Sequence, residues 1–305
     1  MKLSLGVKSD PIEYRYSYEW LFDLMAEAKA PYLQLGSFTE MFSLEPEWFA
    51  RLGEKAKGRG ITIKSVFTSH RELGGLFSGD PSLGRVAIEN YRRLIDVGAA
   101  VGADYVGSNL GRSFQDRFDE KVPGMVKSIE HLKNMMAYAK EKGLKGLSVE
   151  PMSCLAEPPT LPEECTSLML ELGNFHKANP NTVPCYFCSD ISHGYADAEG
   201  VVVHDNWSLF RHNAPWTCEF HFKNTDKIFN STFGFNPEER ERGIVKLDTF
   251  RNLIDEVAPA FPVERVVGYL EIGGPKHGRD YSDINLGKAL KESLAALNDA
   301  FDFAP

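Results

Sequence analysis

The sequence has no long apolar run, no block of basic residues and few cysteines, and each shortage excludes a class of protein. No stretch of 18 apolar residues occurs in the 305 residues, so no membrane-spanning segment is predicted. Acidic residues outnumber basic ones by 43 to 34, and without a Lys/Arg cluster no nucleic-acid partner is expected. Five cysteines, an odd number, indicate reduced thiols rather than a disulfide framework.

The first residues also lack the apolar core of a secretory leader. Lys8 and Asp10 come too early in the chain for such a core. Together with the low cysteine content, this predicts a cytoplasmic protein.

What the sequence does contain is an alternation of short apolar runs and longer stretches with helical spacing. The predicted strands are 3–7, 32–36, 61–68, 105–109, 146–150, 185–190, 217–221 and 266–271. The predicted helices are 18–30, 46–58, 83–102, 125–143, 162–178, 247–258 and 284–301, with 205–212 as a further candidate.

Eight successive strand–helix units without a linker predict an α/β fold, a single (β/α)8 TIM barrel over residues 1–305. The alternative is a doubly wound open sheet. No Gly-x-Gly-x-x-Gly turn follows the first predicted strand, where a Rossmann domain would need it. The chain is longer than the ~250 residues typical of a TIM barrel, and we expect a loop insertion around 224–245.

Four consecutive predicted strands end in a residue that can bind a metal. These residues are Glu150, Asp190, His221 and Glu271, and the alternation of side chains along each strand points them into the barrel. Three converging carboxylates would repel one another unless a cation compensates them. The oxygen-rich set favours one divalent ion, Mn²⁺, Co²⁺ or Mg²⁺. The alternative is that each residue is an ordinary loop or ion-pair residue.

The segments around these residues resemble the xylose-isomerase-like TIM barrels, and among them the sugar (phosphate) isomerases and epimerases of the ketose 3-epimerase type. The segments are 148–152, 189–193, 219–223 and 269–273. The resemblance implies that Glu150, Asp190, His221 and Glu271 are the metal ligands. It also implies that Glu150 and Glu271 are the catalytic acid/base pair, and that His193 contacts the substrate.

Two positions depart from the pattern of that family. The family's substrate-binding Glu corresponds to Glu157 here, with a shift of one residue. The Arg that follows the ligand His corresponds to Lys227, and Lys binds an oxygen with different geometry from Arg. These differences leave the identity of the sugar open.

Several basic residues follow the predicted strands and would lie at the mouth of the barrel. We expect His70, Arg112 and Lys223 to contact the substrate. Arg71, Lys276, His277 and Arg279 are further cations in such positions. Together they would attract an anionic substrate, such as a sugar phosphate or sugar acid. Alternatively, each is a solvated loop charge.

The sequence therefore predicts a metal-dependent isomerase or epimerase of a small keto sugar or its phosphate or acid derivative. The reaction would proceed by proton abstraction and an enediolate, and the enzyme is expected to be a homo-oligomer. A lyase that dehydrates a keto-polyol on the same barrel is the main alternative. A related DNA-repair endonuclease is disfavoured by the net charge of −9.

Overall fold

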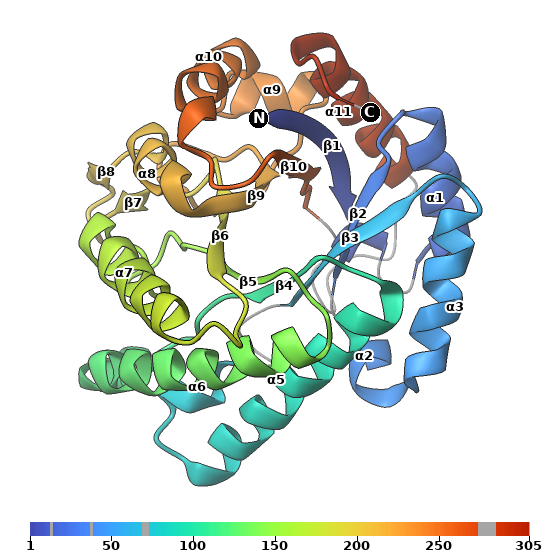
Figure 1. Cartoon of the computed structure of the whole chain (residues 1–305). Coiled ribbons are helices and arrows are strands. Elements are labelled where there is room, and N and C mark those ends of the chain that lie inside the picture. The colour runs from blue at the N-terminus through green and yellow to red at the C-terminus, as the bar shows by residue number, and fades with distance from the viewer. Residues whose placement is uncertain (13–14, 37–38, 69–72, 274–284, 305) are drawn as a thin grey trace. The chain divides into compact units, whose positions relative to one another are not determined.

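The computed structural model of the chain describes residues 1–12, 15–36, 39–68, 73–273 and 285–304. Eight strands form a closed barrel in the order β1-β10-β9-β6-β5-β4-β3-β2 (Figure 1). They are β1 (Lys2–Lys8), β2 (Tyr32–Gly36), β3 (Thr62–Thr68), β4 (Tyr105–Ser108), β5 (Gly146–Val149), β6 (Cys185–Asp190), β9 (Thr217–Phe222) and β10 (Arg265–Leu270). Each lies within one residue of its predicted limits, and the predicted (β/α)8 barrel is confirmed.

The helices follow the strands in the alternation that the sequence predicts. They are α1 (Tyr18–Glu27), α2 (Thr39–Ser43), α3 (Pro46–Lys57), α5 (Pro81–Val101), α6 (Lys121–Glu141), α7 (Pro162–Ala178), α8 (Asn206–Asn213), α9 (Pro237–Arg242), α10 (Leu247–Val257) and α11 (Leu286–Ala300). Helix α1 ends three residues before its predicted limit, because Lys29 adopts a left-handed φ of 55°. None of the helices in the described ranges is long and apolar enough to cross a membrane.

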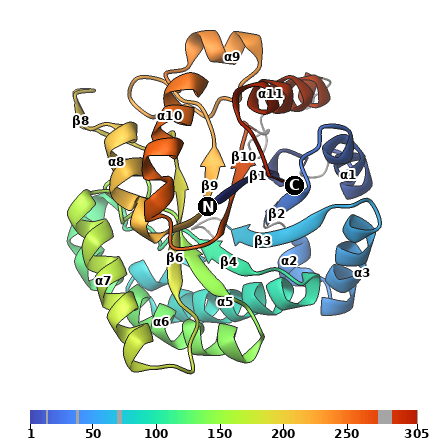
Figure 2. The same ribbon diagram turned by 45° about the horizontal axis from the view of Figure 1, so that its top comes forward.

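The contacts of the chain divide it into two compact units. The first comprises Met1–Gly36, Glu54–Ile63 and Ser189–Pro305. Its core contains a cluster of phenylalanine rings in which Phe250 of α10 contacts Phe210, Phe220 and Phe222 at centroid distances of 5.1 to 5.6 Å. Figure 2 shows α10 running beside β9, which carries two of these rings. The cluster therefore fixes β9 against α10.

The second unit comprises Ser37–Gly53 and Lys64–Cys188. In it, α5 packs closely against β4 because Gly98 has no side chain: a Cβ there would lie 2.3 Å from Cγ2 of Val106. Strands β4 and β5 pair in parallel from Tyr105↔Gly146 to Ser108↔Val149. This pairing brings the end of β5 next to the end of β4.

Residues 224–245, which were predicted as an insertion, are part of the first unit. Asn224 and Phe233 form an antiparallel bridge, and the short helix α9 follows. Phe229 lies against Gly194, where an added Cβ would come within 2.3 Å of the phenylalanine ring. The small hairpin of β7 (Tyr195–Ala196) and β8 (Val202–His204), which the sequence did not predict, begins at this glycine.

Candidate functional site

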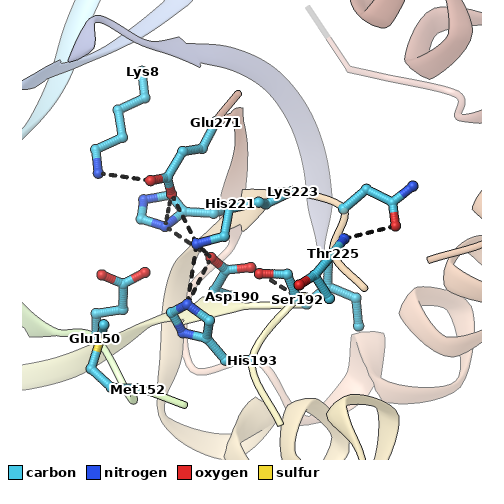
Figure 3. Close-up of polar contacts among 12 residues, drawn as sticks. Lys8, Glu150, Met152, Asp190, Ser192, His193, His221, Lys223, Thr225 and Glu271 are labelled. Atoms are coloured by element: carbon cyan, nitrogen blue, oxygen red, sulfur yellow. Dashed lines mark hydrogen bonds and ion pairs between the residues drawn. The ribbon is translucent and has the colours of Figure 1, made fainter. Parts of the chain in front are cut away.

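Three of the predicted ligands come together at one end of the first unit. Asp190 is the last residue of β6, His221 lies on β9, and Glu271 directly follows β10. Strand β9 adjoins both β6 and β10 in the barrel. One donor atom from each of the three residues lies within 4.8 Å of the others. The three side chains converge from separate strands (Figure 3).

The ring of His221 is held in a fixed orientation. Its Nε2 atom lies 2.8 Å from Oε1 of Gln34 on β2, and its Nδ1 atom lies 2.9 Å from Oε2 of Glu271. The amide oxygen of Gln34 can accept a hydrogen bond from Nε2–H, and Nδ1 then faces the carboxylate of Glu271. A hydrogen bond of this kind on the outer ring nitrogen is typical of histidines that bind a metal.

Two buried lysines accompany the three residues. Nζ of Lys223 lies 2.7 Å from Oδ2 of Asp190 and 3.9 Å from Oε2 of Glu271. Nζ of Lys8 lies 3.0 Å from Oδ2 of Asp10 and 3.4 Å from Oε1 of Glu271. Each lysine is only 7% exposed. The ammonium group of Lys8 therefore faces Oε1 of Glu271, and that of Lys223 faces Oε2 (Figure 3).

The lysines keep the carboxylates ionised. Burial by itself raises the pKa of Asp190, but the charges of His193 and Lys223 outweigh it and hold that pKa well below its usual range. For Glu271, burial likewise raises the pKa, and the charges of Lys223, Lys8 and His221 bring it well below its usual value. Both carboxylates are therefore charged at neutral pH and available to a cation.

His193 lies beside these charges. It is 8% exposed, and its Nε2 atom lies 3.4 Å from Oδ2 of Asp190 and 3.1 Å from Nζ of Lys223. The backbone N–H of His193 donates to the carbonyl of Asp190 at 3.1 Å. The tight turn after β6 thus carries both a ligand candidate and a substrate-contact candidate.

The second unit holds the remaining described candidates apart from Lys227. Glu150 directly follows β5 and is 5% exposed, and its Oε2 accepts a hydrogen bond from Nδ2 of Asn109 at 3.1 Å. Arg112 and Glu157 form an ion pair with Nε and Oε1 3.8 Å apart. The structure therefore joins two residues that the sequence assigned separately to the substrate.

Several solved structures share this fold over almost the whole length of the chain. A protein from Rhodospirillum rubrum assigned as a xylose isomerase has 18% identity and a TM-score of 0.75, covering 98% of this chain and 100% of its own. D-psicose 3-epimerase from Clostridium cellulolyticum, solved with D-tagatose, has 16% identity and a TM-score of 0.70, covering 98% of both chains. A protein from Bacillus anthracis assigned as a 3-DHS dehydratase has 13% identity and a TM-score of 0.67, covering 97% of this chain and 98% of its own.

The fold is a (β/α)8 TIM barrel, which these solved structures share. No family model and no curated protein matches the sequence. At the identities of the solved structures, the likeness defines the architecture, whereas the activity has to be argued from the site.

In this barrel, the chemistry of Asp190, His221 and Glu271 fits a divalent ion. Two carboxylates and one imidazole are ligands that Mn²⁺, Co²⁺ and Mg²⁺ accept. Ligand atoms about 2.0–2.2 Å from one ion lie roughly 3–4 Å from each other. The separations of up to 4.8 Å between the donor atoms require only small side-chain movements. Asp190, His221 and Glu271 could therefore hold a metal.

The sequence-predicted substrate contacts have different surroundings. Lys223 is buried among the ligand candidates, which argues against the alternative of a solvated loop charge. Lys227 is exposed. His70 lies outside the described residues, as do Arg71, Lys276, His277 and Arg279.

Three residues of the site, Lys8, Asp10 and Gln34, were not predicted from the sequence. Lys8 is the last residue of β1, and Gln34 interrupts the otherwise apolar β2. A polar residue near the end of a barrel strand is the signal that could have found them.

Proposed function

We propose that this protein is a divalent-metal-dependent isomerase or epimerase of a small keto sugar or of its phosphate or acid derivative, and that residues 1–305 form one catalytic domain. The observation that carries the proposal is the set of Asp190, His221 and Glu271, of which the first two are buried and the third half-buried, with donor atoms within 4.8 Å of one another. Manganese as the native metal, a homo-oligomeric state and a cytoplasmic location stay predictions from the sequence.

Glu150 is the fourth ligand in this proposal. It directly follows β5, and β5 pairs with β6, the strand that ends at Asp190. In a closed parallel barrel, the ends of neighbouring strands open onto the same face. The hydrogen bond from Asn109 orients the carboxylate.

The proposed reaction moves one proton on and off a carbon atom of the substrate. A divalent cation at this site supplies Lewis-acid charge that offsets the negative charge developing on the substrate oxygens. The carboxylate of Glu150 or Glu271 removes the proton from the carbon beside the carbonyl group, and the other returns a proton to form the product. His193 and Glu157 bind the substrate hydroxyl groups and hold the carbon within reach of the bases.

The function is tested with a panel of tetroses, pentoses, hexoses, sugar acids and sugar phosphates in D₂O, followed by NMR. We expect deuterium at one carbon of a single substrate class and a product of the same mass apart from the label. Loss of water would instead identify a lyase, the reaction class for which the dehydratase of the same fold is the precedent. No exchange and no product with any sugar would contradict the proposal.

The roles of the two glutamates are tested by Glu150→Gln and Glu271→Gln. Each variant keeps an oxygen ligand but loses the base, so we expect metal to stay bound and kcat to fall at least ~100-fold. With two bases, each substrate epimer should exchange its proton in only one of the two variants. Glu199→Gln, at an exposed position, is the matched control. Near-normal turnover in a metal-loaded Gln variant would show that this glutamate is a ligand only, with His193 and Glu157 next to be tested as the base.

A further inference from the structure

Lys223 places a permanent positive charge inside the set of metal ligands. The residue directly follows β9, two positions after His221, and its ammonium group contacts Asp190, His193 and Glu271 at 2.7, 3.1 and 3.9 Å. Its neighbours Phe222 and Asn224 are completely buried. The backbone at this point is therefore fixed, and only the lysine side chain is free to change position.

A divalent ion and the ammonium of Lys223 compete for the same oxygen atoms. Both would take Oδ2 of Asp190, and two positive charges at such a distance in a buried site repel each other strongly. A bound ion would therefore move the ammonium off the carboxylates and leave it beside His193, whose Nε2 atom lies 3.1 Å from Nζ. His193 is the residue expected to contact the substrate, so this movement turns the charge toward the substrate.

Lys8 differs from Lys223 in the carboxylates that it contacts. Lys8 contacts Asp10 at 3.0 Å as well as Glu271, and Asp10 is not a ligand candidate. Both carboxylates that Lys223 contacts are ligand candidates. Metal binding thus affects the position of Lys223 much more than that of Lys8.

We propose that Lys223 binds an anionic group of the substrate in the metal-loaded site, and that the substrate class is an anionic keto sugar, either a sugar acid or a sugar phosphate. The inference rests on the proposed function and narrows it. An ammonium group forms a much stronger hydrogen bond with a carboxylate or phosphate oxygen than with a neutral hydroxyl. A buried ammonium beside His193 therefore selects against neutral sugars.

The first test measures competition between Lys223 and the metal, without any substrate. Mn²⁺ binding is followed by the EPR signal of the free ion in wild type, Lys223→Met and Lys223→Gln. Removing the competing charge should tighten Mn²⁺ binding at least about tenfold in both variants, the effect of one charged contact. Lys127→Met removes an equal charge from an exposed position on α6 and should leave the affinity unchanged. Wild-type affinity in both Lys223 variants would overturn the competition.

The second test compares three probes that differ in a single group: D-glucitol, D-gluconate and D-glucitol 6-phosphate. Their binding to the Mn²⁺-loaded protein is measured by calorimetry. We expect one of the two anions to bind at least about tenfold more tightly than glucitol, and which anion does so identifies the acid or the phosphate. Lys223→Met should abolish the preference and Lys127→Met should preserve it. Any binding of Mn²⁺ by the free anion is the same for every variant and cancels in the comparison.

The outcomes separate this inference from the proposed function. Equal binding of all three probes, or a preference that survives Lys223→Met, would overturn the anionic class and leave the isomerase proposal standing, because neither test measures turnover. A preference that depends on Lys223, together with no deuterium exchange on any sugar, would support the anion site and contradict the proposed reaction.

Discussion

At the scale of single residues, Gln34 determines which nitrogen of His221 is available. Its oxygen lies 2.8 Å from Nε2 and is completely buried with the ring. Without that acceptor, the buried Nε2–H group would lose its hydrogen bond to Gln34, and the ring could flip or change tautomer. The orientation of one ligand candidate therefore depends on a residue that is not itself a ligand candidate.

We predict that Gln34→Leu weakens Mn²⁺ binding by about 10- to 100-fold, the usual effect of losing a hydrogen-bond partner of a metal-binding histidine. Gln34→Glu keeps an acceptor for Nε2–H and should lose much less affinity. Both dissociation constants are measured by EPR of free Mn²⁺, with circular dichroism to establish that the variants fold. Wild-type affinity in Gln34→Leu would show that His221 needs no such support.

The sequence predicted some residues of the site and not others, for physical reasons that differ from residue to residue. Asp190, His221 and Glu271 were predicted because each lies at the end of a strand, where a charged side chain stands out. Lys223 is also next to a strand end, but its sequence position is equally consistent with a surface loop. Only the three-dimensional structure shows that its ammonium group lies against Asp190. Gln34 and Lys8 are far from the other residues in sequence, and a contact across 187 positions, such as that between Gln34 and His221, leaves no local pattern.

At the scale of elements, strands and long helices were predicted well and short irregular segments were not. Helix α7 and strands β2 and β6 agree with their predicted limits at both ends, because Pro or polar residues mark their boundaries. Helix α6 begins four residues earlier than predicted, at Lys121. The β7–β8 hairpin was not predicted, because strands of two and three residues are too short to show an alternating pattern.

Helix α6 carries a histidine that should make the stability of the protein depend on pH. His131 packs edge-on against the ring of Tyr91 on α5, with the centroids 5.3 Å apart. Burial, with a smaller contribution from the charge of Arg92, lowers the pKa of His131 to about 4. In the unfolded chain, the pKa of a histidine is about 6.5. Between these values the unfolded chain binds one more proton than the folded protein.

We therefore predict that the free energy of unfolding falls as the pH decreases from 7 to 5, with His131 contributing about 1–2 kcal/mol of the decrease. Urea denaturation at the two pH values measures it. His131→Gln removes the titrating group, and its unfolding free energy should change less over the same range by that amount. An equal pH dependence in wild type and His131→Gln would rule out this contribution.

At the scale of the whole molecule, the sequence predicted the closed barrel from the number and order of its units. It did not predict the end of the chain. The N–H group of Ala304 donates to the carbonyl of Leu3 at 2.7 Å, and Oγ of Ser4 donates to the carbonyl of Ala304 at 3.0 Å. The residues after α11 show no periodic pattern, and the docking of Ala304 against β1 comes from tertiary contacts alone.

Metal binding should stabilise the molecule as a whole, because its ligands belong to strands from different parts of the chain. A ligand at 100 times its dissociation constant adds about 2.7 kcal/mol to the free energy of unfolding, which for 305 residues raises Tm by about 4 °C. We predict such a rise on adding Mn²⁺ to chelator-treated protein, measured by calorimetry. Asp190→Ala should show no rise. The same Tm with and without Mn²⁺ in the wild type would contradict the metal site.

The contact between Gly194 and Phe229 has a consequence for any attempt to change the substrate range by directed evolution. Gly194 directly follows His193, so a library aimed at the substrate would naturally include it. Any side chain at 194 collides with the ring of Phe229, and most single substitutions there would be discarded for misfolding rather than for their selectivity. The two positions are epistatic, and useful combinations become accessible only when codons 194 and 229 are randomised together.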